Sequence, residues 1–79
     1  PNPANNLAML KFNLSSMVDD ASIKIVDPLG RVVCGLDNQT YNPGLNEIEL
    51  NVRNLNPGWY NVIFDSPKRK ISTKMMINN

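Results

Sequence analysis

The side chains that most often carry out catalysis are nearly absent from this sequence. It contains no histidine, which is the commonest general base and metal ligand at neutral pH. Its one cysteine, Cys34, has no histidine to activate it, and a thiol without such a partner is a poor nucleophile. Two acidic pairs, Asp19-Asp20 and Glu47/Glu49, are typical of a solvated loop or strand face. We therefore expect no catalytic residues and no enzyme.

No residue spacing indicates a metal or cofactor site. A calcium loop needs a ladder of oxygen ligands such as Asp-x-Asp-x-Asp-Gly, and a phosphate-binding loop needs several glycines in a short stretch. Neither pattern occurs in the 79 residues, so we expect no cofactor and no metal. A single cysteine also has no partner for an internal disulfide. If exposed, Cys34 would allow a dimer, in crystals or through an intermolecular disulfide.

Three aromatic residues offer a binding alternative. Trp59, Tyr60 and Tyr41 together would resemble the stacking platform of a carbohydrate-binding module. Adjacent residues of a strand point to opposite faces, however, so Trp59 and Tyr60 cannot share one face. We expect Tyr60 to point inward with Val62 and Phe64. Trp59 is then a single ring, which makes a weak platform, and carbohydrate binding is the second choice.

Charge and hydropathy exclude further classes of protein. Eight basic and seven acidic residues give a net charge of +1, which argues against a nucleic-acid-binding protein. Lys68-Arg69-Lys70 is the only basic run, and we interpret it as a solvated turn. No apolar stretch approaches the roughly twenty residues that a transmembrane helix needs. No signal peptide opens the chain, so we interpret it as one domain of a longer protein.

Apolar and polar residues alternate with a period of two along most of the chain, which is typical of strands with one buried face. The stretch 59–65 is apolar on both faces and suits a central strand. Residues 15–20 are polar and are predicted to form a loop. The pattern predicts a single all-β domain, an antiparallel β-sandwich of about seven strands. The predicted strands are residues 8–14, 21–25, 31–36, 39–41, 48–52, 59–65 and 71–77.

The clearest turn signal is Asp27-Pro28-Leu29-Gly30-Arg31. Asp27 can accept hydrogen bonds from nearby amides, Pro28 has a fixed φ, and Gly30 tolerates a left-handed conformation. These residue types predict a hairpin loop with a bulge. Arg31 leaves the loop close to Asp27, so we expect an ion pair across the hairpin base.

Two further turns share an Asn-Pro-Gly sequence, at residues 42–44 and 56–58. Proline followed by glycine fits a type II turn, in which the glycine takes a positive φ. Each turn is predicted to lead directly into a strand.

Four short motifs stand in order along the chain, and each is weak alone. In this order and length they resemble the C-terminal sorting domain of type IX secretion system cargo, the type A family of Bacteroidetes, also called the Por secretion system sorting domain. The resemblance covers essentially the whole chain, residues 1–79. Its motif residues here are Pro1, Pro3 and Asn5; Asp27, Gly30 and Arg31; Gly58 and Tyr60; and Lys74 and Ile77.

The resemblance implies an Ig-like sandwich with Greek-key connections, preceded by a linker with the opening motif at residues 1–6. It also implies a secretion signal. The passenger domain on the N-terminal side travels through the periplasm, and the outer-membrane translocon and its shuttle protein recognise the sorting domain. The passenger reaches the cell surface or is secreted, and a sortase-like cysteine protease removes the sorting domain.

Most of the motif residues also have a purely structural explanation. Gly30 and Gly58 are expected to supply backbone conformations, and Tyr60 and Ile77 to lie in the core. Pro1 and Pro3 are expected to stiffen the linker.

Exposed charge is what a partner can read directly, which favours Arg31, Lys74 and Lys70 as recognition groups. A purely structural role for the motifs is an equal alternative. Trp59 and Cys34 depart from the family pattern, which usually has a smaller aliphatic residue and a polar residue at these positions.

Two alternatives to a sorting domain stay open. Flagellar hook-capping proteins carry a similar Ig-like domain, but the Trp-Asp-Gly segment typical of them is replaced here by Asn-Glu-Ile-Glu-Leu-Asn at residues 46–51. The wider alternative is an adhesive, structural or carbohydrate-binding accessory module of a secreted protein.

Overall fold

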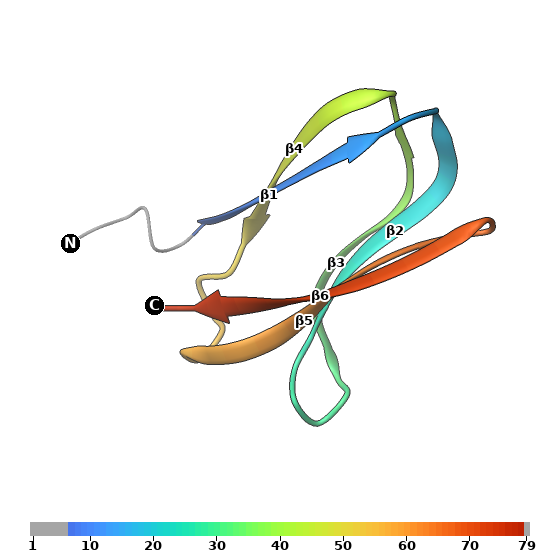
Figure 1. Ribbon diagram of the computed structural model, residues 1–79. Coiled ribbons are helices and arrows are strands. Elements are labelled where there is room, and N and C mark those ends of the chain that lie inside the picture. Colours follow the sequence, from blue (N-terminus) through green and yellow to red (C-terminus); the bar gives the residue numbers. More distant parts are fainter. Residues whose placement is uncertain (1–6, 79) are drawn as a thin grey trace.

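The structure, a computed structural model, describes residues 7–78 and consists of six β-strands in two sheets (Figure 1). One sheet has the order β1-β4 and the other the order β3-β2-β5-β6, and every pairing is antiparallel. The all-β prediction is therefore confirmed. The strands are β1 (Leu7–Leu14), β2 (Val18–Val26), β3 (Val32–Tyr41), β4 (Gly44–Asn51), β5 (Gly58–Ser66) and β6 (Arg69–Ile77).

The prediction of seven strands is wrong, because the segments 31–36 and 39–41 belong to one strand, β3. Asn38 has a φ of 54° and Asp20, near it on β2, has a φ of 53°. The β2–β3 register shifts twice between Val18 and Ile23. An irregular residue of this kind bends a strand without ending it. The polar residues near position 38 therefore mark a bend and not a turn.

The polar loop predicted at residues 15–20 is also shorter than expected. Strand β2 begins at Val18, so three residues from Ser15 to Met17 connect it to β1. Asp19 and Asp20 lie within β2 and are exposed. The side-chain oxygen of Asp19 accepts a hydrogen bond from the hydroxyl of Thr40 on β3, at 3.0 Å. Asp19 and Asp20 therefore belong to a strand, and the neighbouring strand β3 supplies a hydrogen bond to Asp19.

The core lies where apolar side chains of the two sheets meet. Ile23 and Ile25 of β2 are fully buried, and the ring of Phe12 lies 5.4 Å from the ring of Tyr41 and 5.4 Å from that of Phe64. Edge-to-face contacts of this kind add stability to the apolar area that the rings bury. Phe12 comes from the smaller sheet, so this aromatic cluster joins the two sheets.

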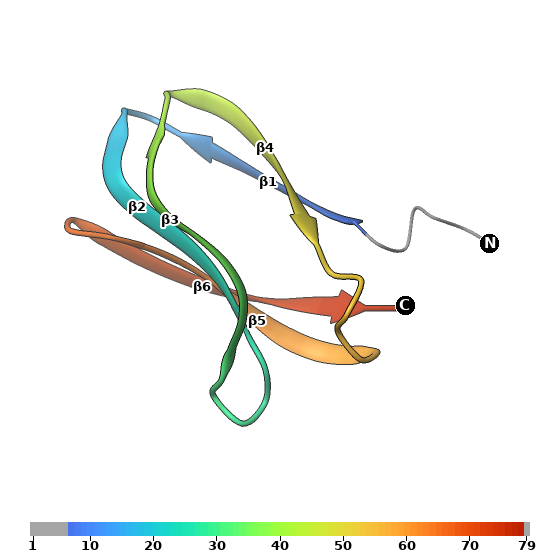
Figure 2. The same cartoon turned by 180° about the vertical axis from the view of Figure 1, so that it is seen from behind.

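Strand β5 lies between β2 and β6, as expected for a central strand, and Tyr60, Val62 and Phe64 are buried as predicted. Strand β6 departs from its pattern. Its inward positions 71, 73, 75 and 77 were expected to be buried alike, but Ile71 is 46 % exposed and only Ile77 is fully buried. The reason is that a sheet of two strands faces a sheet of four, and β6 is an edge strand of the larger sheet (Figure 2).

Residues 7–78 include no helix long and apolar enough to cross a membrane.

Candidate functional site

The Asp27–Arg31 turn is held by a dense set of hydrogen bonds to one side chain. The Asp27 Oδ1 accepts from the backbone N–H of Leu29 at 3.0 Å and from that of Arg31 at 2.8 Å. The Asp27 Oδ2 accepts from the Nε–H of Arg31 at 2.8 Å. Backbone hydrogen bonds from Asp27 to the Arg31 carbonyl and from Gly30 to the Asp27 carbonyl close the loop. The predicted hairpin and ion pair are both confirmed.

The same contacts set the electrostatics of the turn. Asp27 is 8 % exposed, and the backbone amide of Arg31 is the main cause that holds the pKa of the Asp27 carboxyl below its usual value. The Arg31 side chain is 72 % exposed, but its Nε is already bound to Asp27. Gly30 has a φ of +89°, where a side chain would be strained. The turn is therefore rigid, and its cation is partly neutralised.

The second motif lies at the start of β5. Gly58 is the first residue of the strand and has a φ of +145°. Two residues later, Tyr60 is buried, and its hydroxyl donates to the backbone carbonyl of Asn56 at 2.7 Å. A tyrosine hydroxyl bound to the backbone a few residues upstream also fixes a corner in Ig-like domains. The contact ties the 56–58 turn to the strand that follows it.

Tertiary structure brings these two motifs together. A hollow of about 260 Å³ is lined by Asp27 and Arg31 from the turn and by Gly58, Trp59 and Tyr60 from β5. The reason is the β2–β5 register, in which Val26 pairs with Asn61, so the residues that follow β2 meet the residues that begin β5.

The third motif borders the same end of the four-stranded sheet. Lys74 of β6 pairs with Asn61 and lines a second hollow of about 130 Å³ together with Trp59 and Pro28. Ile77 pairs with Gly58 and is 3 % exposed, as the core role requires. Figure 1 shows the beginning of β5 beside the end of β6. The predicted residues Pro1, Pro3 and Asn5 lie outside the described part of the chain.

Trp59 lines both hollows, a role that the sequence did not predict. Its side chain is 56 % exposed, and it lines both hollows, next to Pro28 in each. The alternation with Tyr60 already indicates that Trp59 points outward. Its position beside the turn has no signal in the sequence, because thirty residues lie between Pro28 and Trp59.

A three-ring sugar platform is wrong for this protein. Tyr41 and Tyr60 are both buried, so Trp59 is the one exposed ring of the three. Tyr41 also differs from Tyr60 in its hydroxyl, which is buried and has no hydrogen-bond partner among residues 7–78. Burial raises the pKa of Tyr41.

Cys34 is half-buried and not freely exposed. It pairs with Ile25 on β2, and its thiol lies 3.7 Å from the backbone carbonyl of Asn51, which ends β4. The thiol thus reaches from one sheet toward the other. A disulfide-linked dimer stays a prediction, and it would require this side chain to turn outward.

The arrangement of the described residues offers recognition more readily than chemistry. Residues 7–78 contain no group of three or more acidic or cysteine side chains placed to hold a metal ion. What the residues build is a rigid turn, a strand start tied to its own loop, and an exposed indole beside an ammonium group. A surface of this kind is suited to contact with another protein.

Comparison with known families identifies the family of the chain. The family described as the secretion system C-terminal sorting domain matches residues 1–78, and the chain belongs to this family, the sorting domains of type IX secretion. The predicted resemblance is confirmed. The family is not an enzyme family, and membership implies interaction with the type IX machinery and export across the outer membrane. No curated protein and no solved structure was found to match the chain.

Proposed function

We propose that this domain is a C-terminal address that directs its passenger through the type IX translocon, and that the surface around Trp59 is the part that is read. We define the address surface as Asp27–Arg31, Gly58–Tyr60 and Lys74. The observation that supports it is the convergence of three separate motifs on two adjoining hollows. Motif residues that only stabilised the fold would have no need to share one end of a sheet.

Within the address surface, the groups differ in what they offer a partner. Both oxygens of the Asp27 carboxylate already accept hydrogen bonds from Arg31, one from its backbone N–H and one from its Nε–H. Lys74 is exposed and forms no ion pair among the described residues. Trp59 supplies apolar area next to this cation. We therefore assign direct contact with the translocon or its shuttle protein to Lys74 and Trp59, and the shaping of the surface to Asp27, Gly30 and Gly58.

The finer steps of the pathway belong to the same proposal. The passenger lies on the N-terminal side of the domain and reaches the outer membrane through the periplasm. The domain has an Ig-like sandwich fold with Greek-key connections. After export, a sortase-like cysteine protease removes it, and the passenger remains at the cell surface or is released.

Export of a reporter tests the address surface directly. Residues 1–79 fused behind a periplasm-targeted reporter in a type IX-competent bacterium should place the reporter outside the cell. The Lys74→Gln and Trp59→Ala variants should reduce export severalfold, while circular dichroism shows that both variants remain folded. Lys68→Gln is the matched control, because Lys68 is an exposed lysine in the hairpin turn at the opposite end of β6.

The alternatives give different results in the same set of proteins. Retention of the reporter in the periplasm, while a known sorting domain is exported in parallel, would contradict the proposed function. Equal export of Lys74→Gln and Lys68→Gln would contradict the address surface alone. Specific binding on a glycan array that is lost in Trp59→Ala would favour a carbohydrate-binding module.

A further inference from the structure

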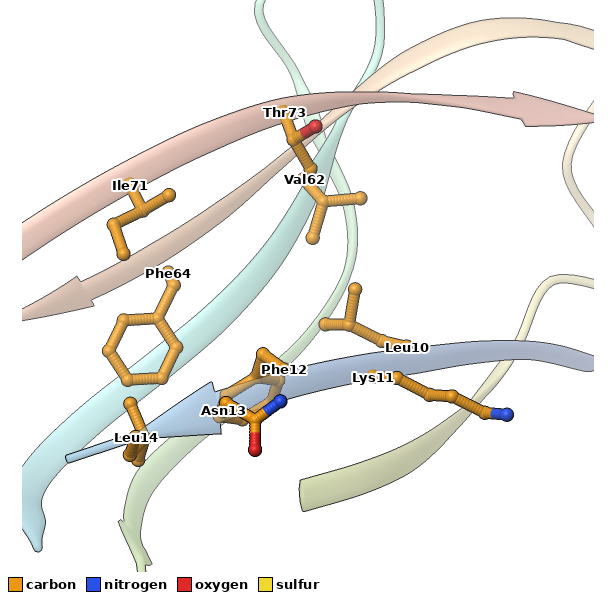
Figure 3. A pocket seen from close by; sticks show the side chains of 9 residues that line it. All are labelled: Leu10, Lys11, Phe12, Asn13, Leu14, Val62, Phe64, Ile71 and Thr73. Carbon is orange, nitrogen blue, oxygen red and sulfur yellow. The ribbon is translucent and has the colours of Figure 1, made fainter. Parts of the chain in front are cut away.

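An apolar groove opens between β1 and β6, on a different side of the molecule from the Asp27 turn. It has a volume of about 130 Å³, and Leu10 and Phe12 of β1 line it together with Val62, Phe64 and Ile71. In Figure 3 the side chains of Val62, Phe64 and Ile71 point from β5 and β6 toward β1. The exposed fraction of Ile71, 46 %, is explained by this opening.

Both strands that border the groove are sheet edges. Within residues 7–78, β1 pairs with β4 alone and β6 pairs with β5 alone. The free side of an edge strand presents unpaired backbone N–H and C=O groups, and an extended segment can add to it as a further strand. A strand added beside β6 would point every second side chain over the groove. The β6 edge therefore has the geometry of a strand-addition site.

The charge of the bound segment follows from the opposite face of β6. Ile71 and Thr73 face the groove, so Lys70 and Lys74 lie on the outer face. Lys70 stands opposite Asp65 in the register, but no ion pair joins the two side chains. Side chains at the outward positions of an added strand would lie directly beside the two lysines. Carboxylates at those positions would complement them.

We propose that the free edge of β6 binds an extended segment of a partner protein in which apolar and acidic residues alternate. The apolar residues fill the groove over Ile71 and Thr73, and the acidic residues lie beside Lys70 and Lys74. A second copy of β6 is a poor occupant, because lysines would face lysines across the pair. The proposal does not rest on the secretion function, since strand addition is a property of the folded chain.

Peptide binding to the 79-residue chain tests this. The probe is a capped nine-residue peptide in which glutamate alternates with valine, and the matched control peptide has lysine in place of glutamate. We expect the glutamate peptide to bind and the lysine peptide not to, with affinity that falls as salt is added. Bound peptide should slow amide exchange in alternate residues of β6. The amides of β3, the other edge of the same sheet, should be unaffected.

Two variants separate the two parts of the site. Lys70→Glu should weaken binding of the glutamate peptide by about tenfold, because it replaces an attraction by a repulsion. Ile71→Thr should weaken binding of the glutamate peptide. It should equally weaken binding of a second peptide that has serine in place of glutamate. Arg53→Glu is the control, because Arg53 is an exposed cation in the loop between β4 and β5, away from β6.

Three results would overturn the proposal. The first is no binding of the glutamate peptide to the folded chain. In that case the lysines of β6 would serve only to prevent aggregation at the sheet edge. The second is equal binding of the two peptides. The third is dimerisation of the chain itself through β6, with exchange protection on that strand in the absence of peptide.

Discussion

Asp27 and Arg31 bind each other through three hydrogen bonds, which join backbone to backbone, backbone to side chain and side chain to side chain. One is the Asp27 N–H to the Arg31 carbonyl at 2.9 Å, and Gly30 adds its own N–H to the Asp27 carbonyl at the same distance. In the other direction, Arg31 donates from its amide and from Nε. The pair that the sequence predicts across the hairpin base thus holds the whole turn together.

The Asp27 carboxylate should make the stability of the protein depend on pH. Its pKa in the folded protein lies below the ordinary value of 3.8, so the unfolded chain binds the proton more readily. This part of the stability is fully present above about pH 4 and is lost as the pH falls through the folded pKa. Urea unfolding of the wild type and of Asp27→Asn between pH 2 and pH 7 measures it.

Asp27→Asn should be less stable than the wild type at neutral pH and should lose part of the acid-dependent change. Asp37→Asn is the control, because Asp37 is exposed and its carboxylate forms no ion pair among the described residues. An unchanged acid limb in Asp27→Asn would show that the turn does not hold the carboxylate as described.

Gly30 and Gly44 have nearly the same φ, so comparing their alanine variants distinguishes an effect on stability from an effect on recognition. Gly30 has a φ of +89° and Gly44 a φ of +97°, and an added Cβ would meet nothing within 4 Å at either position. Alanine should therefore cost about 1 kcal/mol at both sites through backbone strain alone. Because Gly30 shapes the address surface and Gly44 does not, only Gly30→Ala should reduce reporter export. Equal losses of export would trace the effect to stability.

The two buried tyrosines should respond in opposite ways to removal of the hydroxyl. Tyr60→Phe breaks the 2.7 Å hydrogen bond to the Asn56 carbonyl and should destabilise the fold by about 1 kcal/mol. Tyr41→Phe removes a buried hydroxyl that has no partner among residues 7–78, so it should be neutral or stabilising. Chemical denaturation at neutral pH compares them, and a large loss in Tyr41→Phe would contradict the contacts described for its hydroxyl.

Two isoleucines of β6 should differ in what they contribute to stability, although the sequence pattern treats them alike. Ile77 is 3 % exposed and Ile71 is 46 % exposed. Ile77→Ala should cost about 3 kcal/mol, and Ile71→Ala about 1 kcal/mol, because the groove already leaves much of Ile71 in water. The midpoints of urea unfolding give both values. Similar costs would mean that the groove is closed in solution.

Much of the local structure follows from residue type. Asp27, Pro28 and Gly30 each suit their place in the turn, and the turn forms as predicted, since its hydrogen bonds join residues at most four apart. The burial of Tyr60, Val62 and Phe64 follows from simple alternation, because a strand turns successive side chains to opposite faces. Family membership also came from short motifs in order, and these are linear features of the sequence.

The errors concern where strands begin and end and how far the opposite sheet covers them. Asn38 reads as the end of a strand, but pairing with β2 carries β3 through it, since a single residue at positive φ bends a strand without breaking its ladder. Ile71 has the alternation of a core residue, but it lines the open groove between β1 and β6 and stays 46 % exposed. Pairing and coverage depend on residues distant in the sequence, so local alternation cannot predict them.

The sequence by itself therefore determined the all-β class, the Asp27–Arg31 turn and the family to which the chain belongs. Only the tertiary structure decided that the Asp27 turn, Trp59 and Lys74 share one end of a sheet, and that β1 and β6 leave a groove between them. The physical reason is that strand register is a long-range property. Pairing Val26 with Asn61 and Asn61 with Lys74 brings three distant segments side by side, and no single one of them encodes that contact.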